Sequence, residues 1–105
     1  MKILVTGGCG YLGTILVKKL LNKNFKVVVI DQMWFGNFLK KNKNLRIIKD
    51  DFRNINNYKL PKINSIIHLA NIANDPGAEL NPSLSWEINV LGTEILMNYA
   101  KKNKI

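Results

Sequence analysis

The amino-acid sequence predicts an α/β fold in which a doubly wound parallel sheet carries helices on both faces. Short runs rich in β-branched residues alternate with amphipathic runs at helical spacing. The expected strands are almost continuously apolar, as is typical of strands buried on both faces of a parallel sheet. A segment with four glycines, TGGCGYLG at residues 6–13, joins the first strand to the first helix. Right-handed crossovers then give the strand order 3-2-1-4, which is the first half of a doubly wound sheet.

Each element follows from its local pattern. Strands are expected at residues 2–6, 25–31, 45–50 and 63–70, and the first helix at 11–24, where leucine and isoleucine recur at helical spacing. A long helix is expected at 84–102, with Ser83 or Ser85 as its N-cap. Short helices are expected at 37–43 and 53–58. We see no linker, so residues 1–105 are expected to form one domain.

The chain is strongly basic, with a formal net charge of +9 over 105 residues. This charge invites a nucleic-acid interpretation. The lysines, however, are scattered and lie mostly at the ends of expected helices, and no basic stripe alternates with aromatic residues. We therefore expect no specific nucleic-acid binding, only solubility and non-specific attraction.

Cysteine usage and apolar runs indicate the compartment. Cys9 is the single cysteine, which rules out an internal disulfide and a multi-cysteine metal site, and suits a reducing environment. The N-terminus lacks the apolar stretch of a signal peptide. No run approaches the roughly 18 apolar residues of a membrane helix. We expect a cytoplasmic protein with no membrane segment and no metal site.

The glycine segment fits G-x-G-x-x-G from Gly8 to Gly13, between a strand and a helix, which is the context that this motif requires. Gly7 or Gly8 permits a tight turn, Gly10 lets a pyrophosphate approach the backbone, and Gly13 lets the helix pack closely. The N–H groups at the helix start then face the phosphates. The alternative is a glycine-rich turn without a ligand. The cofactor-binding candidates here are Gly7, Gly10, Tyr11, Leu12 and Gly13, in a Rossmann-like NAD(P)-binding domain.

Asp31 is the second candidate element of a dinucleotide site. It ends the expected second strand, 18 residues after Gly13. A carboxylate at this place accepts hydrogen bonds from ribose hydroxyls and repels a 2′-phosphate, so the residue favours NAD over NADP. The alternative is an ordinary aspartate in a turn after a strand.

These motifs resemble those of the NAD-dependent epimerase/dehydratase family, within the extended short-chain dehydrogenases/reductases, and the resemblance runs the whole chain. T-G-x-x-G-x-x-G from Thr6 is the glycine motif of that group. DDFRN at 50–54 is similar to the family's segment after strand three, which implies that Asp51 contacts the adenine amino group and Phe52 lies beside the ring. IIHLA at 66–70 is similar to the strand-four motif, which implies that Leu69 and Ala70 run along the cofactor.

Two further segments extend the resemblance. NVLGT at 89–93 is similar to the N-V-x-G-T of the following helix. Asparagine is disfavoured inside a helix, so Asn89 is expected to make a specific hydrogen bond, to the strand-four backbone or to the cofactor site. Residues 69–82 resemble a subset of the family with Asn-Asp-Pro after strand four. Asn71 is a departure, because the family usually has Ala or Gly there.

Several candidates also have plain structural interpretations. Asp50 and Asp51 could cap a short helix, Asp50 more so than Asp51. His68 lies at a strand end and is a candidate general base, but we favour a packed, hydrogen-bonded histidine. Cys9 needs no redox role. Trp34, Phe35, Phe38 and Trp86 are expected to serve packing rather than ligand stacking.

The resemblance also implies a catalytic Tyr-x-x-x-Lys pair on the helix after strand five. Tyr58 and Lys62 have this spacing, but Pro61 lies between them, so they cannot share a helical face. Tyr99 is followed by Asn103 at the fourth position. We therefore predict that residues 1–105 contain no catalytic residue. The chain is expected to be a truncated, N-terminal half that lacks the substrate domain and is inactive alone. The resemblance implies that the whole enzyme transfers hydride on a nucleotide sugar.

The predicted half-sheet has an open edge at strand four, and the long helix lacks a neighbour. We expect partial exposure of an apolar face formed by Ile88, Leu91, Ile95 and Leu96, and a face of this kind favours binding to a protein partner. Three alternatives stay open for helix 84–102: it pairs with a second copy, with a separately encoded C-terminal half, or with nothing. Two other functions stay open: a stand-alone nucleotide-binding module, and an interaction protein that binds no ligand.

Overall fold

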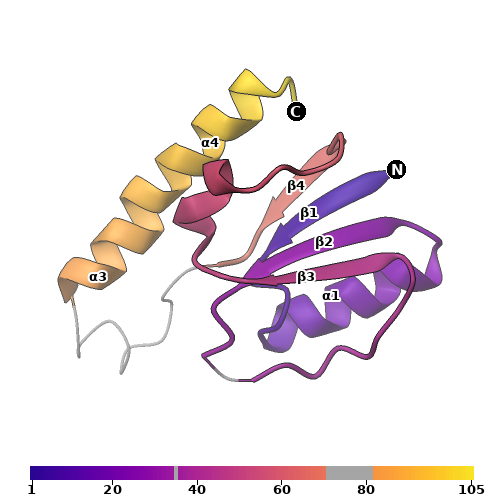
Figure 1. The fold of residues 1–105 in the computed structure, drawn as a ribbon. Coiled ribbons are helices and arrows are strands. Elements are labelled where there is room, and N and C mark those ends of the chain that lie inside the picture. Colours follow the sequence, from indigo (N-terminus) through magenta and orange to yellow (C-terminus); the bar gives the residue numbers. More distant parts are fainter. Residues whose placement is uncertain (35, 71–81) are drawn as a thin grey trace.

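The computed structural model describes residues 1–34, 36–70 and 82–105. One parallel sheet of four strands forms the centre, in the order β3-β2-β1-β4 (Figure 1). The strands are β1 (Lys2–Thr6), β2 (Lys26–Asp31), β3 (Leu45–Lys49) and β4 (Ser65–His68). The predicted fold class and strand order are confirmed.

The helices differ more from expectation than the strands do. The first helix is α1 (Tyr11–Asn22), and a 3-10 helix, η1 (Phe52–Asn57), lies between β3 and β4. The long helix consists of α3 (Pro82–Trp86), the π-helical segment η2 (Glu87–Gly92) and α4 (Thr93–Lys102). The N-cap expected at Ser83 or Ser85 is wrong, because the helix begins at Pro82, and proline suits a first helical turn, whose N–H groups have no intrahelical acceptor.

The helix expected over residues 37–43 does not form. Asn37 accepts a hydrogen bond through its side-chain oxygen from the N–H of Leu39, and Asn42 accepts one in the same way from Asn44. These local turns offer the backbone an alternative to helical hydrogen bonds. Asparagine therefore breaks the helix that the spacing of apolar residues predicts.

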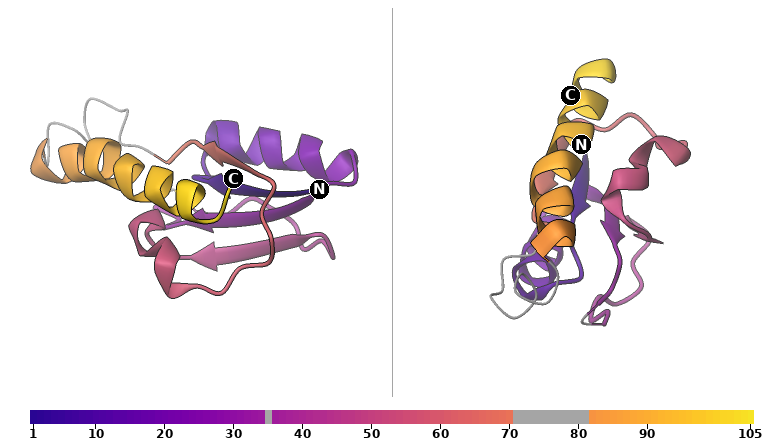
Figure 2. Two further views of the ribbon diagram at one scale, coloured as in Figure 1. Left: turned by 90° about the horizontal axis from the view of Figure 1, so that it is seen from above. Right: turned by 90° about the vertical axis from the view of Figure 1, so that its left-hand side faces the viewer.

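The sheet is the middle layer of three (Figure 2). On one face α1 packs against a cluster of buried residues that the strands β1 and β2 share with it: Ile3, Val5, Cys9, Val17, Val27 and Val29. On the other face η1, η2 and α4 pack against a second cluster: Leu4, Val28, Ile30, Ile48, Phe52, Ile55, Ile63, Ile88 and Leu96. Each strand therefore alternates its side chains between two cores, which explains the continuous apolar runs.

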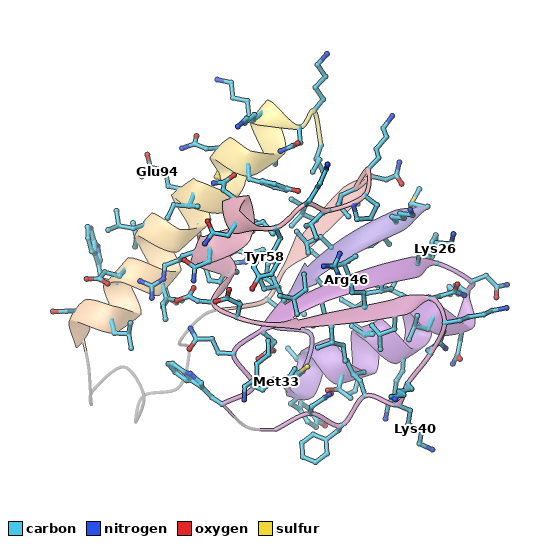
Figure 3. All side chains as sticks on the ribbon, in the orientation of Figure 1. Lys26, Met33, Lys40, Arg46, Tyr58 and Glu94 are labelled. Carbon is cyan, nitrogen blue, oxygen red and sulfur yellow. The ribbon has the colours of Figure 1, made fainter. Side chains whose placement is uncertain are left out.

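The exposed face of the long helix is not the one that its sequence predicts. Ile88 and Leu96 are buried, since η1 folds under the helix and shares one core with them. The expectation that both are exposed is therefore wrong, whereas Leu91 is exposed as expected. The large exposed apolar side chains in the described part of this helix are Trp86, Val90, Leu91 and Met97. Glu94 is also exposed and points away from the sheet (Figure 3). None of the helices in the described residues is long and apolar enough to cross a membrane.

Gly92 allows the long helix to approach η1. A Cβ atom at this position would lie 2.6 Å from Cζ of Phe52 and 2.9 Å from its Cε2. Phe52 is itself buried and cannot move aside freely. We expect Gly92→Ala to lower the free energy of unfolding by about 2 kcal/mol in a urea titration, because overpacking strains the core.

The matched control for Gly92→Ala is Met97→Ala on the exposed side of the same helix. This change should alter the free energy of unfolding by less than about 0.5 kcal/mol. Equal stabilities of the two variants would contradict the close approach at Gly92.

Candidate functional site

The carboxyl ends of the strands meet at one edge of the sheet. Thr6 pairs with Ile30 and His68, and Asp31 pairs with Lys49. The segments that follow these strand ends therefore lie together, and an open pocket forms between them. Six of the residues predicted for the site line this pocket: Gly7, Gly10, Asp31, Phe52, Leu69 and Ala70.

The pocket lining and the predicted site overlap only in part. The predicted site residues that do not line the pocket are Tyr11, Leu12, Gly13, Asp51 and Asn89. The lining residues that sequence reasoning missed as site residues are Cys9, Ile30, Gln32, Trp34, Gly36, Asp50 and Ile88. Trp34 had a signal in the sequence, since it follows Asp31 by three residues at the same strand end.

Trp34, Phe38 and Trp86 were expected to serve packing, and the structure contradicts this. The three side chains are 52%, 69% and 56% exposed. Trp34 donates a hydrogen bond from its ring nitrogen to the side chain of Gln32 and leaves its indole at the pocket. Phe35, Asn71 and the Asn-Asp-Pro sequence at 74–76 lie outside the described residues.

The four glycines of residues 6–13 divide into three that the fold requires and one that it does not. Gly7 has a φ of +73°, which side chains rarely adopt. A Cβ atom at Gly8 would lie 2.7 Å from the side chain of Val29, and one at Gly13 would lie 2.2 Å from the carbonyl oxygen of Gly7. At Gly10 the nearest atom, the oxygen of Gly7, is 3.4 Å away. Of the four, Gly10 alone could carry a Cβ atom without strain or a clash, and it lines the pocket.

The start of α1 leaves backbone donors beside Gly10. Gly10 is the N-cap in an extended conformation, and no side chain caps the helix. The first intrahelical bond runs from the N–H of Thr14 to the oxygen of Gly10, 2.9 Å away. The N–H groups of Tyr11 and Leu12 precede it and have no acceptor within the helix. These two N–H groups are therefore open to an anion beside Gly10.

Asp31 holds the glycine segment to the end of β2. One carboxylate oxygen accepts from the N–H of Cys9 at 2.9 Å, and the other from the N–H of Met33 at 2.6 Å. Met33 packs with the apolar cluster against α1 (Figure 3). A carboxylate has about four acceptor positions, so both oxygens can take further donors from a ligand in the pocket.

Asp50 and Asp51 have different roles. Asp51 is the N-cap of η1 and forms an ion pair with Arg53, which also contacts Glu87. The expectation that Asp50 is the more probable cap is therefore wrong. Asp50 lines the pocket and accepts hydrogen bonds from Tyr58 and Asn54, which lower the pKa of its carboxyl group.

Tyr58 lies beyond the end of η1, in extended backbone, and its hydroxyl donates to Asp50 (Figure 3). This hydrogen bond raises the pKa of Tyr58. Lys62 is exposed and follows Pro61 in the loop before β4. The two residues share no helix, so the structure agrees with rejecting them as a catalytic pair.

Cys9 is buried in the glycine segment, where its thiol contacts the side-chain oxygen of Asn37. Burial and the negative charge of Asp31 raise the pKa of the thiol from 9.0 to about 11. The thiol is therefore protonated at neutral pH and unreactive. We expect the folded chain to react with iodoacetamide at pH 7.5 about 100-fold more slowly than the urea-unfolded chain, in line with its smaller thiolate fraction. Equal rates would contradict this environment of Cys9.

Asn89 lies in η2 and is half-buried, and its carbonyl oxygen accepts a hydrogen bond from the hydroxyl of Thr93 at 2.9 Å. Its neighbour Ile88 reaches the pocket lining. His68 is packed against Phe52 and hydrogen-bonded through both ring nitrogens, as favoured from the sequence.

The chain has relatives among known proteins. The model of the NAD dependent epimerase/dehydratase family matches residues 3–105. The chain belongs to this family. A putative UDP-glucose 4-epimerase of Methanocaldococcus jannaschii is 32% identical over 98% of this chain and 35% of the relative. The UDP-glucuronic acid decarboxylase 1 of Danio rerio is 31% identical over 96% of this chain and 25% of the relative.

Solved structures of the family agree with the fold. The UDP-glucose 4-epimerase of Thermotoga maritima, solved with UDP-glucose, superposes on the whole chain with a TM-score of 0.88 at 26% identity, and the match covers 35% of that chain. The UDP-glucose 4-epimerase of Thermus thermophilus, solved in complex with NAD, superposes with a TM-score of 0.81, also at 26% identity and over 35% of its length. The chain thus spans about a third of these relatives and is similar to their N-terminal, Rossmann-fold part.

Proposed function

We propose that the chain binds NAD in this pocket, as the cofactor-binding part of an oxidoreductase that acts on nucleotide sugars. The observation that carries this proposal is that Gly10, a glycine that the fold does not require, lines the pocket beside an uncapped helix start and the carboxylate of Asp31. Backbone donors for a pyrophosphate and an acceptor for ribose hydroxyls thus lie at one strand edge. The nucleotide-sugar part of the proposal comes from the printed names of the relatives.

Each predicted residue has a part in this proposal. The N–H groups of Tyr11 and Leu12 bind the pyrophosphate above Gly10, while Gly7 and Gly13 shape the segment. NAD, when bound, supplies the hydride acceptor for the oxidation of a sugar hydroxyl. The remaining candidates divide between the adenine side, with Asp51 and Phe52, and the nicotinamide side, with Leu69, Ala70 and Asn89.

The preference for NAD over NADP rests on Asp31. Its carboxylate already accepts two backbone N–H groups, which fix it beside Gly10 at the pocket. A fixed negative charge there repels a 2′-phosphate, whereas ribose hydroxyls donate to it.

Turnover, in this proposal, needs residues outside the 105 of this chain. No tyrosine of the chain has a lysine four residues later on the same helix, since Tyr58 and Lys62 are separated by Pro61 and Tyr99 is followed by Asn103. We expect no epimerase or dehydratase activity from the chain alone.

Association is a second part of the proposal. Val90, Leu91 and Met97 are 49%, 38% and 67% exposed on one long helix, and exposed apolar side chains favour a protein partner. We propose that this face meets a second copy or a C-terminal half. The single cysteine, Cys9, agrees with the reducing cytoplasm in which we propose that the protein works.

A titration of the ¹⁵N-labelled chain with NAD, followed by two-dimensional NMR, tests the site directly. The amide signals of Gly10, Tyr11, Leu12 and Ala70 should shift most, and those of Lys101 and Lys102 at the far end of the long helix should stay in place. Shifts confined to lysine-rich surfaces would show non-specific anion binding and would contradict the proposal.

A further inference from the structure

His68 is the single histidine of the chain, and its ring joins three elements. Nδ1 lies 2.5 Å from the hydroxyl oxygen of Thr6 on β1, and Nε2 lies 3.0 Å from that of Thr93 at the start of α4. The ring also packs edge-on against Phe52 of η1, with ring centres 4.8 Å apart. One side chain thus ties the end of β4 to β1, η1 and α4.

The neighbouring hydrogen bonds decide which ring nitrogen carries the proton. The hydroxyl of Thr93 donates its one hydrogen to the carbonyl oxygen of Asn89, 2.9 Å away, so it can only accept from His68. The hydroxyl oxygen of Thr6 accepts the N–H groups of Leu69 at 3.1 Å and of Ala70 at 3.2 Å, so its hydrogen is free for Nδ1. The neutral ring with its hydrogen on Nε2 is the form that satisfies every one of these bonds.

Protonation of the ring breaks this arrangement. A hydrogen on Nδ1 would point at the oxygen of Thr6, which already accepts two N–H groups and would then face three donors. One of these two bonds must lengthen, and because Leu69 also donates to the backbone oxygen of Thr6 at 3.0 Å, the consequence falls on Ala70. Leu69 and Ala70 line the pocket, and Gly7 packs so tightly on them that a Cβ atom there would lie 2.8 Å from the nitrogen of Ala70.

We propose that His68 is a positioning residue for the dinucleotide pocket: the neutral ring, protonated on Nε2, locks the Leu69–Ala70 wall to β1 and to the helix of Thr93, and protonation at acidic pH releases this lock and weakens dinucleotide binding. The effect on dinucleotide binding rests on the proposed function, whereas the hydrogen-bonded lock itself does not.

The neutral form of the ring is favoured by burial and not by a neighbouring charge. Burial is the cause that lowers the pKa of His68 below 6.5, and no neighbouring charge contributes. The titratable groups on the elements packed around the ring are Lys2 on β1, Asp51 and Arg53 at η1, Glu87 on η2, and Glu94, Tyr99, Lys101 and Lys102 on α4. Arg53 pairs with both Asp51 and Glu87, so the nearest charges at η1 and η2 satisfy one another.

The sign of the pH effect follows from the lowered pKa. The unfolded chain takes up a proton at His68 near pH 6.5, and the folded chain does so only at lower pH. The contribution of His68 to stability is therefore complete above pH 6.5 and is lost as the pH falls through the pKa of the folded state.

The ring nitrogens of His68 in the ¹⁵N-labelled chain provide the first test, and the single histidine makes their assignment unambiguous. At pH 7.5 we expect the hydrogen on Nε2 and a bare Nδ1, and a titration midpoint below 6.5. A hydrogen on Nδ1, or a midpoint at or above 6.5, would overturn the lock. This measurement needs no NAD.

The second test measures NAD affinity at pH 7.5 and at a pH below the midpoint that the first test finds for the ring. We expect it to fall about three- to tenfold in the wild-type chain, as for the loss of one hydrogen bond, and to stay constant in His68→Gln, whose amide keeps a donor and does not titrate. Thr93→Val should weaken the preference for the Nε2 hydrogen, and Thr93→Ser should keep it. An equal pH effect in His68→Gln would overturn the role of His68. If the ring is in the expected state but NAD does not bind at either pH, the proposed function is wrong, and the predicted effect on binding is wrong with it.

Discussion

Gly10→Val is expected to weaken NAD binding by about 100-fold while the chain stays folded. The loss corresponds to two charge-assisted hydrogen bonds to the pyrophosphate, each worth about 1.5 kcal/mol, which the valine side chain blocks. The backbone of Gly10 is extended, and a Cβ atom meets only the oxygen of Gly7 at 3.4 Å, so the side chain has room in the absence of ligand. Calorimetry measures the affinity, and a urea titration should show a stability loss of at most about 1 kcal/mol from the poorer N-cap.

Gly13→Ala is the matched control in the same motif. Its Cβ atom would lie 2.2 Å from the carbonyl oxygen of Gly7 and 2.7 Å from the Cα of Gly8, and backbone atoms cannot yield as a side chain does. We expect this variant to lose about 3 kcal/mol of stability. If Gly10→Val instead unfolds the chain, or binds NAD as the wild type does, the assignment of Gly10 to the ligand is wrong.

Asp31→Asn is expected to reduce NAD affinity by about tenfold and to raise NADP affinity, so that the preference between the two shrinks or reverses. The variant loses the charge that strengthens hydrogen bonds from ribose hydroxyls and repels a 2′-phosphate. It keeps one side-chain oxygen for the N–H of Cys9 or Met33, the two partners of the carboxylate. Parallel calorimetric titrations with NAD and NADP give the ratio of the two affinities.

The control for Asp31→Asn is Asp50→Asn, which removes a second carboxylate from the same pocket. Asp50 bonds to Tyr58 and Asn54 rather than to the glycine segment. It should change both affinities alike and leave their ratio unchanged. If Asp50→Asn changes the ratio of NAD to NADP affinity and Asp31→Asn does not, the role given to Asp31 is wrong.

The fold was predictable because its signals are local. Apolar strands, helical spacing and one glycine segment specify the order β3-β2-β1-β4 through the general handedness of crossovers. The motifs likewise predicted six residues that line the pocket, since parallel strands bring their carboxyl ends to one edge.

What escaped prediction depends on contacts between distant segments. The burial of Ile88 and Leu96 requires η1 to fold under the long helix, which no local spacing encodes. The choice of Asp51 rather than Asp50 as the cap depends on Arg53 and Tyr58, which pair with one aspartate each. The place of Trp34 at the pocket depends on the loop after β2, where its ring nitrogen donates to Gln32.

Calorimetric titration of the wild-type chain with NAD, and separately with NADP, tests the central claim most directly. Saturable binding of one NAD per chain, with weaker binding of NADP, is the predicted result. A folded chain that binds neither dinucleotide would contradict the claim that these residues form a working cofactor site.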